Sequence, residues 1–356
     1  MMEIEPPPTT IQRWKWNMRP YRRALGLGGR RRAGVLMYHR VADEISDPWG
    51  LCVTPDHFAQ HMELLARHNA QIDLADLHGR KGYAPFGRRI AVTFDDGYLD
   101  NFTQAVPILE RYGIPATIFV VAGALGRSEF WWDALDRAIL GEGALPGELT
   151  IEIGGEMHSF DLAGLASEPA GDSRWNAGYN PPETPRQAFF IALWQAISAV
   201  APAEQERAVA HILEWAGKPL APPPDRGTAS IDDVAKLKDH PLVTIGSHTM
   251  NHVSLPDLSP EDQKEEVESG HRALEEMIGA KIDRFSYPFG RYTQPARDCA
   301  EALGATLACT SHDGAVTPNS DLMAIPRLQV EDMDGDAFGE WLFRQYGLME
   351  PRGWNP

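Results

Sequence analysis

The sequence predicts an α/β protein whose main fold is a distorted (β/α) barrel of seven to eight mostly parallel strands, with a helical, Trp-rich insertion. Short apolar or β-branched runs alternate with helical stretches, which is the pattern of a parallel sheet with crossover helices. Glycine and proline supply 32 and 28 of the 356 residues, so turns are plentiful and a purely helical bundle is disfavoured. The alternation breaks between residues 127 and 230, where five tryptophans gather.

Seven apolar runs are expected to form the strands of the barrel. In chain order they are Val35–His39, Ile90–Asp95, Ala116–Val121, Leu242–Ser247, Arg284–Pro288, Thr306–Thr310 and Met323–Val330. The carboxyl ends of barrel strands lie at one face, where the catalytic residues of this architecture gather. Residues at the ends of these runs are therefore the first candidates for a functional site.

Helices are expected between the strands because start and stop signals flank the periodic stretches. Thr54 and Ser259 are N-cap residues followed by proline, and they start helices over 55–68 and 260–278. Further helices are expected over 101–112 and 294–303 in the barrel and over 184–200 and 203–216 in the insertion.

These elements divide the chain into four parts. A basic N-terminal segment covers residues 1–32, the barrel covers 33–126 and 231–335, the insertion covers 127–230, and a C-terminal tail covers 336–356. The insertion is expected to hang on one strand-to-helix loop of the barrel.

The chain is strongly acidic apart from its N-terminus. Its formal net charge is −17, and an acidic body repels polyanions, so no nucleic-acid partner is expected. Residues 1–40 carry nine Lys or Arg against two Glu, interleaved with aromatic residues. This segment is either solvated or in peripheral contact with an anionic membrane surface.

Cysteine usage and hydropathy favour a cytoplasmic protein. Cys52, Cys299 and Cys309 lack C-x-x-C spacing, which argues against a disulfide framework and against a thiolate metal site. The first 30 residues lack the apolar core of a secretory signal, and no segment has the ~18 apolar residues of a spanning helix. Any membrane contact is then expected at the inner face, through the basic N-terminus.

The motif T-F-D-D-G ends the expected strand Ile90–Asp95. Like charges as close as Asp95 and Asp96 disfavour simultaneous ionisation unless a cation neutralises one of them. Adjacent strand residues also point to opposite sides, so the two carboxylates suit different tasks, one as a metal ligand and one as a base. The alternative is an Asp-Asp-Gly turn that caps the next helix.

A second motif, H-T-M-N-H, follows the expected strand Leu242–Ser247. Histidines at i and i+4, here His248 and His252, lie on one helical face and can bind one cation together. With Asp96 they make three ligands and leave coordination positions open for water and substrate. The alternative is a pair of surface histidines at a helix start.

Two further strand ends carry candidate groups. His39 closes the run V-L-M-Y-H, and a histidine can donate a proton at neutral pH. The motif F-S-Y-P-F-G ends the expected strand Arg284–Pro288 in a Pro/Gly turn, a backbone that can aim an amide N–H at an oxyanion. A core histidine and an ordinary turn are the alternatives, but four such strand ends together favour one shared site.

These motifs, with the opening M-Y-H-R-V, resemble those of polysaccharide deacetylases, the carbohydrate esterase family four, over residues 33–125 and 230–330. That group includes chitin, peptidoglycan and nodulation-factor deacetylases. The resemblance implies that Asp95 is the general base and that the backbone N–H of Phe289 is the oxyanion donor. It implies that Asp96, His248 and His252 bind a divalent cation, in the first place Zn²⁺, with Co²⁺ or Ni²⁺ as alternatives.

The sequence departs from the family pattern at two places. Many members carry their acid histidine in a C-terminal L-x-H motif, and no such motif follows His252. The segment Met37–His39 has that shape, as in circularly permuted members, so His39 is assigned as the acid. Ser286 stands where many members have an arginine that orients the base. Arg327 is the candidate replacement, and a surface charge is the alternative.

We therefore expect a metal-dependent hydrolase that removes an N-acyl group, in the first place N-acetyl, from an amino sugar in a glycan or glycolipid precursor. The alternatives are a hydrolase of another C–N bond, in a formamide or a cyclic ureide, and a non-catalytic carbohydrate-binding protein. Trp131 and Trp132 are candidate substrate contacts because sugar rings stack on indoles, although they could equally anchor the insertion in its core. Tyr287 is a further candidate substrate contact.

Overall fold

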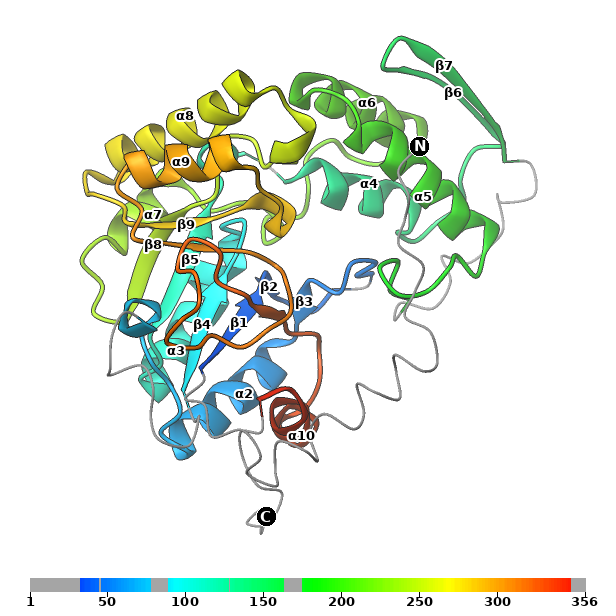
Figure 1. Cartoon of the computed structure of the whole chain (residues 1–356). Helices are drawn as coiled ribbons and strands as arrows, with labels where there is room; N and C mark the ends of the chain where they lie inside the picture. Colours follow the sequence, from blue (N-terminus) through cyan, green and yellow to red (C-terminus); the bar gives the residue numbers. More distant parts are fainter. Residues whose placement is uncertain (1–32, 45, 78–88, 128, 163–174, 347–356) are drawn as a thin grey trace, which may run out of the picture.

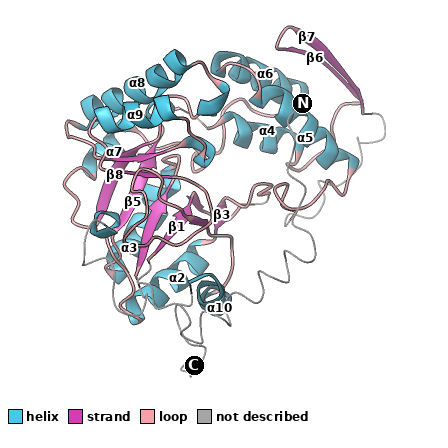
Figure 2. Cartoon of the chain, in the orientation of Figure 1, coloured by secondary structure: helices cyan, strands magenta, loops and turns pink. Residues whose placement is uncertain are grey.

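A curled sheet of seven parallel strands forms the centre of the molecule, with helices packed around its outer side (Figure 1 and Figure 2). The computed structural model describes residues 33–44, 46–77, 89–127, 129–162 and 175–346. The strand order is β10-β9-β8-β5-β4-β1-β11, and every neighbouring pair is parallel. The predicted distorted (β/α) barrel is confirmed.

The strands of this sheet are short and almost wholly buried. Their bounds are β1 (Gly34–Tyr38), β4 (Ile90–Phe94), β5 (Ala116–Val120), β8 (Val243–Ser247), β9 (Arg284–Ser286), β10 (Leu307–Cys309) and β11 (Leu328–Gln329). A separate parallel pair, β2 (Arg40–Val41) and β3 (Cys52–Val53), follows β1. Buried on both faces, these strands read in the sequence as continuous apolar runs instead of alternating ones.

The last predicted strand, Met323–Val330, is wrong over most of its length. Only Leu328–Gln329 pairs with β1 as a strand. Pro326 has no N–H to donate to a neighbouring strand, and the backbone just before it turns, with Ala324 N–H donating to the carbonyl of Asp321 at 3.2 Å. The chain therefore makes a single bridge, between Cys309 and Ile325, before it enters β11.

The helices of the barrel start largely as their capping residues predict. Thr54 and Ser259 accept backbone N–H bonds at the starts of α2 (Pro55–Arg67) and α8 (Pro260–Ile278). The predicted helix over 101–112 begins instead as a π-helical turn, η2 (Asn101–Ala105), which runs into α3 (Val106–Tyr112). The remaining barrel helices are α7 (Ile231–Lys236), α9 (Gln294–Ala302) and α10 (Gly335–Tyr346), and the short 3₁₀ turns are η1 (Leu74–Leu77), η3 (Ala122–Ala124), η4 (Leu255–Asp257) and η5 (Pro288–Gly290).

A buried histidine joins α2 to α10 and to the sheet. The hydroxyl of Tyr38 lies 3.2 Å from Nδ1 of His61, and Nε2 of His61 lies 2.7 Å from the carbonyl of Met333. The imidazole also stacks on Phe338 of α10 with ring centroids 3.9 Å apart. The expected C-terminal tail begins within this helix, because α10 includes residues 336–346. Phe338 and Leu342 of α10 lie in the main core.

The insertion has a hydrophobic core of its own, separate from the core under the sheet. It consists of α4 (Trp131–Ile139), the antiparallel hairpin β6 (Glu148–Ile153) and β7 (Glu156–Asp161), α5 (Pro185–Ser198) and α6 (Pro202–Trp215). Figure 1 shows these elements, in green, beside the barrel, with the hairpin projecting outward. The division of the chain at residues 126 and 231 stays a prediction.

Buried charges connect the insertion to the barrel. Arg40, which follows β1, pairs with Asp100 at 3.0 Å and with Glu44 at 2.8 Å. Glu44 also accepts from Arg226 at 2.7 Å, and Arg226 reaches Asp136 of α4 at 3.9 Å. The segment that returns from the insertion is therefore held against the loop that leaves β1.

Among the described helices, none combines the length and apolar character that a membrane crossing requires.

Candidate active site

The T-F-D-D-G motif leaves β4 in a conformation that separates its two carboxylates. Asp95 continues the strand, with its N–H donating to the carbonyl of Tyr38 at 3.0 Å. Asp96 has a φ of +75°, which is unusual for any residue other than glycine. Both side chains are only 3% exposed. As the alternation of side chains along a strand predicts, the two carboxylates meet different neighbours.

Asp95 is held by a buried arginine. The two terminal nitrogens of Arg327 donate to Oδ1 and Oδ2 of Asp95 at 2.7 and 2.6 Å. The hydroxyl of Ser286 lies 3.3 Å from Oδ2 and itself accepts from Arg327 at 2.9 Å. Burial raises the pKa of Asp95, but the Arg327 guanidinium and then His248 oppose it, and the net pKa lies well below the usual range. Asp95 is therefore an ionised carboxylate with a fixed orientation.

Arg327 is fully buried, which excludes the alternative of a surface charge. Its Nε donates to the carbonyl of Thr310 at 2.9 Å, and Nη1 also reaches the hydroxyl of Thr93 at 3.1 Å. The guanidinium therefore lies at the carboxylate of Asp95. Arg327 comes from the residue just before β11, whereas Ser286 is the last residue of β9.

Asp96, His248 and His252 converge on one point. Oδ1 of Asp96 lies 3.5 Å from Nε2 of His248 and 3.3 Å from Nε2 of His252, and the three atoms lie within 4.8 Å of one another. Within the described part of the chain, this buried Oδ1 has no hydrogen-bond partner. One carboxylate oxygen and two imidazole nitrogens are a donor set typical of zinc, so the residues fit a divalent cation.

The histidines are prepared as ligands. Nδ1 of His248 lies 2.7 Å from the carbonyl of Ser286, and in the neutral imidazole this hydrogen bond leaves the lone pair on Nε2, towards Asp96. Burial lowers the pKa of His252 to about 4, so its imidazole is neutral near pH 7. A neutral imidazole is the form that binds a metal.

The predicted helical arrangement of His248 and His252 is wrong. Both lie in an irregular loop after β8, in which Thr249 and His252 have φ values of +67° and +55°. Positive φ values exclude a right-handed helix, and the loop is held instead by Glu266 of α8, whose carboxylate accepts from the backbone and side-chain amides of Asn251.

Two glycines let other segments approach this site closely. A Cβ on Gly270 of α8 would lie 2.3 Å from the backbone carbon of Thr249, so α8 packs directly under the ligand loop. A Cβ on Gly290 would lie 2.1 Å from the backbone nitrogen of Ser311. Any larger residue at either position would displace the loop that carries His252 or the turn that carries Phe289.

His39 and Phe289 lie in the same cavity as the carboxylates. β1 ends at Tyr38 and delivers His39 to the cavity, where its buried Nδ1 has no hydrogen-bond partner among the described residues. The side chain of Asn101 donates to the backbone carbonyl of His39 at 2.6 Å. Phe289 has a φ of +57°, and its half-exposed ring lies 4.8 Å from the ring of His252.

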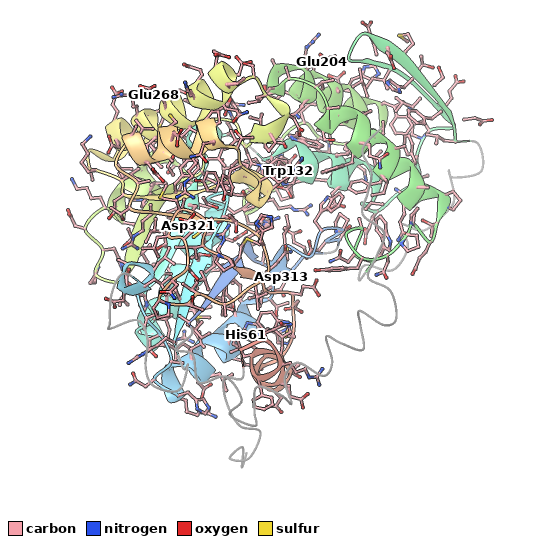
Figure 3. All side chains as sticks on the ribbon, viewed as in Figure 1. His61, Trp132, Glu204, Glu268, Asp313 and Asp321 are labelled. Atoms are coloured by element: carbon pink, nitrogen blue, oxygen red, sulfur yellow. The ribbon has the colours of Figure 1, made fainter. Side chains whose placement is uncertain are left out.

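The three aromatic candidates for substrate contact have different surroundings. Trp132 is 7% exposed, its indole N–H donates to the hydroxyl of Tyr98 at 2.9 Å, and its ring lies 5.1 Å from that of His252. Figure 3 shows it at the boundary between the insertion and the barrel. Trp131 is less buried and lines the cavity. Tyr287 is fully buried, and its hydroxyl donates to the carbonyl of Met323, so the structure does not bring it into the site.

The cavity has a volume of about 420 Å³, within the range of roughly 300–1,000 Å³ typical of small-ligand sites. Sequence reasoning missed several of the residues that line it, namely Trp49, Asn176, Tyr179, Trp194 and Gln329. Trp49 and Trp194 are 145 positions apart and carry no motif, so only their shared residue type could have marked them.

Comparison with known proteins gives a consistent result. The polysaccharide deacetylase family model matches residues 84–144 and 203–308. The chain is 22% identical over 312 residues to YxkH of Bacillus subtilis (strain 168), a protein named after the same family. The aligned region covers 86% of this chain and 75% of YxkH.

Two solved structures share the fold. The deacetylase PplD of Streptococcus pyogenes, solved in complex with acetate, is 17% identical with a TM-score of 0.53, and the match covers 90% of this chain and 100% of PplD. IcaB from Ammonifex degensii is 19% identical with a TM-score of 0.50, over 84% of this chain and 92% of IcaB. These two likenesses show the fold alone. The family match confirms the resemblance: the chain carries a polysaccharide deacetylase domain, and that family indicates a hydrolase of the deacetylase type.

Proposed function

We propose that this polysaccharide deacetylase domain is a metal-dependent enzyme that removes N-acetyl groups from an amino sugar in a glycan or glycolipid precursor. The observation that carries the proposal is the pairing of two adjacent carboxylates with different partners. Asp96 faces two imidazoles and Asp95 faces a guanidinium. A pure binding site has no need for an ionised carboxylate beside a metal-ligand cluster.

In this proposal Asp96, His248 and His252 hold the divalent cation, with Zn²⁺ favoured by the donor set and Co²⁺ or Ni²⁺ as alternatives. A bound cation of this kind supplies Lewis acidity towards the acetyl carbonyl and lowers the pKa of a coordinated water. The neutral imidazole of His252 keeps its Nε2 available. Burial lowers the pKa of His248, but Asp95 and Asp96 outweigh it and the net pKa is raised, so a cation that binds at Nε2 displaces a proton from His248.

Asp95 accepts the proton of the attacking water. Arg327 holds both of its oxygens and keeps the carboxylate ionised, so a proton acceptor is present before substrate arrives. The same guanidinium lowers the basicity of Asp95. Asp95 therefore contributes to the reaction through its fixed orientation as much as through its affinity for a proton. The water needs only to lie within hydrogen-bond reach of Asp95 and next to the cation.

His39 donates the proton that the departing amine requires, and the backbone N–H of Phe289 stabilises the oxyanion. His39 ends a different strand from the base, so the acid and the base approach the scissile C–N bond from separate elements. The positive φ of Phe289 orients its peptide group in the turn beside His252.

A cytoplasmic location, with contact at the inner face of the membrane through residues 1–32, belongs to the same proposal. The basic charge of this segment supports it, and the segment lies outside the described residues. An acylated precursor that is made inside the cell is the substrate class that fits this location.

The test is acetate release from acetylated amino sugars by protein loaded separately with Zn²⁺, Co²⁺ or Ni²⁺. Mass spectrometry then distinguishes the loss of one acetyl group from the loss of one formyl group, the product of the alternative reaction. The Asp95→Asn variant is expected to keep its metal and lose turnover. Equal turnover by Asp95→Asn and the native chain would contradict the assignment of the base.

A further inference from the structure

Four tryptophan rings form a continuous wall that leads away from the metal-ligand cluster. Trp132 lies 5.1 Å from the His252 ring, and Trp131 lies 5.6 Å from Trp132. Trp194 lies 5.9 Å from Trp131, and Trp49 lies 4.7 Å from Trp194. All four line the same cavity as Asp95 and Asp96.

The wall is assembled from three separate segments of the chain. Trp131 and Trp132 begin α4, Trp194 lies on α5, and Trp49 lies in the loop between β2 and β3. The insertion therefore supplies three of the four indoles, and the barrel supplies the fourth. Trp132 is buried behind His252 with its N–H already bonded, whereas Trp49, Trp131 and Trp194 are only partly buried.

Trp49 carries an unsatisfied donor at this wall. Its Nε1 is buried, and within the described residues nothing accepts a hydrogen bond from it. An indole N–H can only donate, and a buried donor without an acceptor costs free energy. This N–H is shielded in the structure, so an oxygen of a ligand in the cavity would remove that cost after a small rotation of the partly buried ring.

Hydrogen bonds hold the backbone at Trp49 against β11. Nε2 of Gln329 donates to the backbone carbonyls of Trp49 at 3.2 Å and Gly50 at 2.8 Å. Gln329 lies in β11, two residues after Arg327. The loop that carries the indole is therefore tied to the same segment that orients Asp95.

We propose that Trp49, Trp131 and Trp194 form a subsite that binds the sugar ring adjacent to the one that loses its acetyl group. The apolar C–H face of that ring packs on the indoles of Trp131 and Trp194, and one of its oxygens accepts from the Trp49 N–H. This inference rests on the proposed function, which places the acetamide at Asp95 and Asp96. The substrate then has at least two sugar rings.

The experiment compares a one-ring probe, N-acetylglucosamine, with a two-ring probe, di-N-acetylchitobiose. Trp49→Phe removes the N–H and keeps an aromatic ring, and Trp194→Ala removes stacking surface, with Trp194→Phe as the variant that retains packing in the insertion. Trp341→Phe on α10 is the matched control. Acetate release gives kcat/KM for each probe, and calorimetry measures binding in an Asp95→Asn background, where turnover plays no part.

We expect native protein to prefer the two-ring probe. Trp49→Phe and Trp194→Ala should each weaken its binding by about tenfold, the order of one lost hydrogen bond or stacking contact. Their kcat/KM should fall more for two rings than for one, and Trp341→Phe should change neither. Equal affinity of the Asp95→Asn protein for both probes overturns the subsite. So does two-ring binding that stays unchanged when Trp49→Phe and when Trp194→Ala is added to that background. Trp-dependent binding without any acetate release by native protein would instead support the subsite and reject the proposed function.

Discussion

Arg327 donates two hydrogen bonds to the carboxylate of Asp95, from a position 232 residues further along the chain. The pair joins the end of β4 to the approach to β11, and these strands flank β1 on its two sides. Three strands are therefore locked together immediately beneath the cavity. The contact also gives the proposed base its charge state and its direction.

The Arg327–Asp95 pair predicts that charge alone cannot replace the guanidinium. Arg327→Lys keeps a cation but loses the paired geometry, so we expect kcat/KM to fall by roughly tenfold or more while bound metal is retained. Arg327→Met leaves Asp95 buried without its partner, which should raise the pKa of Asp95 and cost about 3–5 kcal/mol of stability. Steady-state kinetics, metal analysis and urea unfolding check these outcomes. Arg272→Lys, in an exposed pair with Glu268, is the control.

The ligand cluster predicts that zinc stabilises the fold. At a free Zn²⁺ concentration of about 100 times Kd, a single site adds about 2.7 kcal/mol, which should raise Tm by several degrees. His248→Ala should abolish most of this shift, whereas His158→Ala, on the hairpin of the insertion, should keep it. A zinc shift of native size in His248→Ala would remove this residue from the ligand set.

The position of His39 predicts a loss of proton donation without a loss of metal. His39→Ala should lower kcat by about 10²–10⁴, the range typical of a missing general acid, with unchanged zinc content. Asn101→Ala removes the donor to the His39 carbonyl and should give a smaller decrease. Leaving groups of lower pKa need less protonation, so a substrate with an activated leaving group should partly restore His39→Ala. An absence of any restoration would argue for a structural role.

The burial of His61, which does not line the cavity, predicts an acid-sensitive contact between α2 and α10. Burial lowers the pKa of His61 to about 4, against about 6.5 for a histidine in an unfolded chain. The unfolded state therefore binds the proton more readily, so the stability from neutral His61 is present above pH 6.5 and is lost as the pH falls towards 4. The shift corresponds to about 3 kcal/mol. His61→Gln should flatten the pH dependence of urea unfolding between pH 7 and 4.5, measured with chelator present in both proteins.

Much of the site was accessible from the sequence because parallel strands bring their carboxyl ends to one edge. The runs that end at His39 and Asp95 are continuous, apolar and followed by polar residues, so both strand ends and their convergence could be predicted. Arg327 is a candidate in the sequence only because Ser286 leaves Asp95 without a charge partner. Its burial then depended on packing that local sequence does not encode.

Other features lay outside the reach of pattern reading. The spacing of His248 and His252 suits a helix, but tertiary contacts from Gly270 and Glu266 hold the loop in positive φ conformations. Pro326 interrupts the last expected strand, an effect that the apolar composition around it concealed. Trp49 and Trp194 meet only through the docking of the insertion on the barrel, which no periodicity records.

The groups that would break the C–N bond all come from the barrel, from segments next to its strands, whereas most of the tryptophan wall comes from the insertion. If the proposed function and subsite hold, reaction and selectivity are encoded in different stretches of the chain. Such a separation allows the preference for a substrate to drift through changes in α4 and α5 while the hydrolytic machinery stays untouched. Exchanging the insertion for another of similar length offers a direct route to redirecting this enzyme.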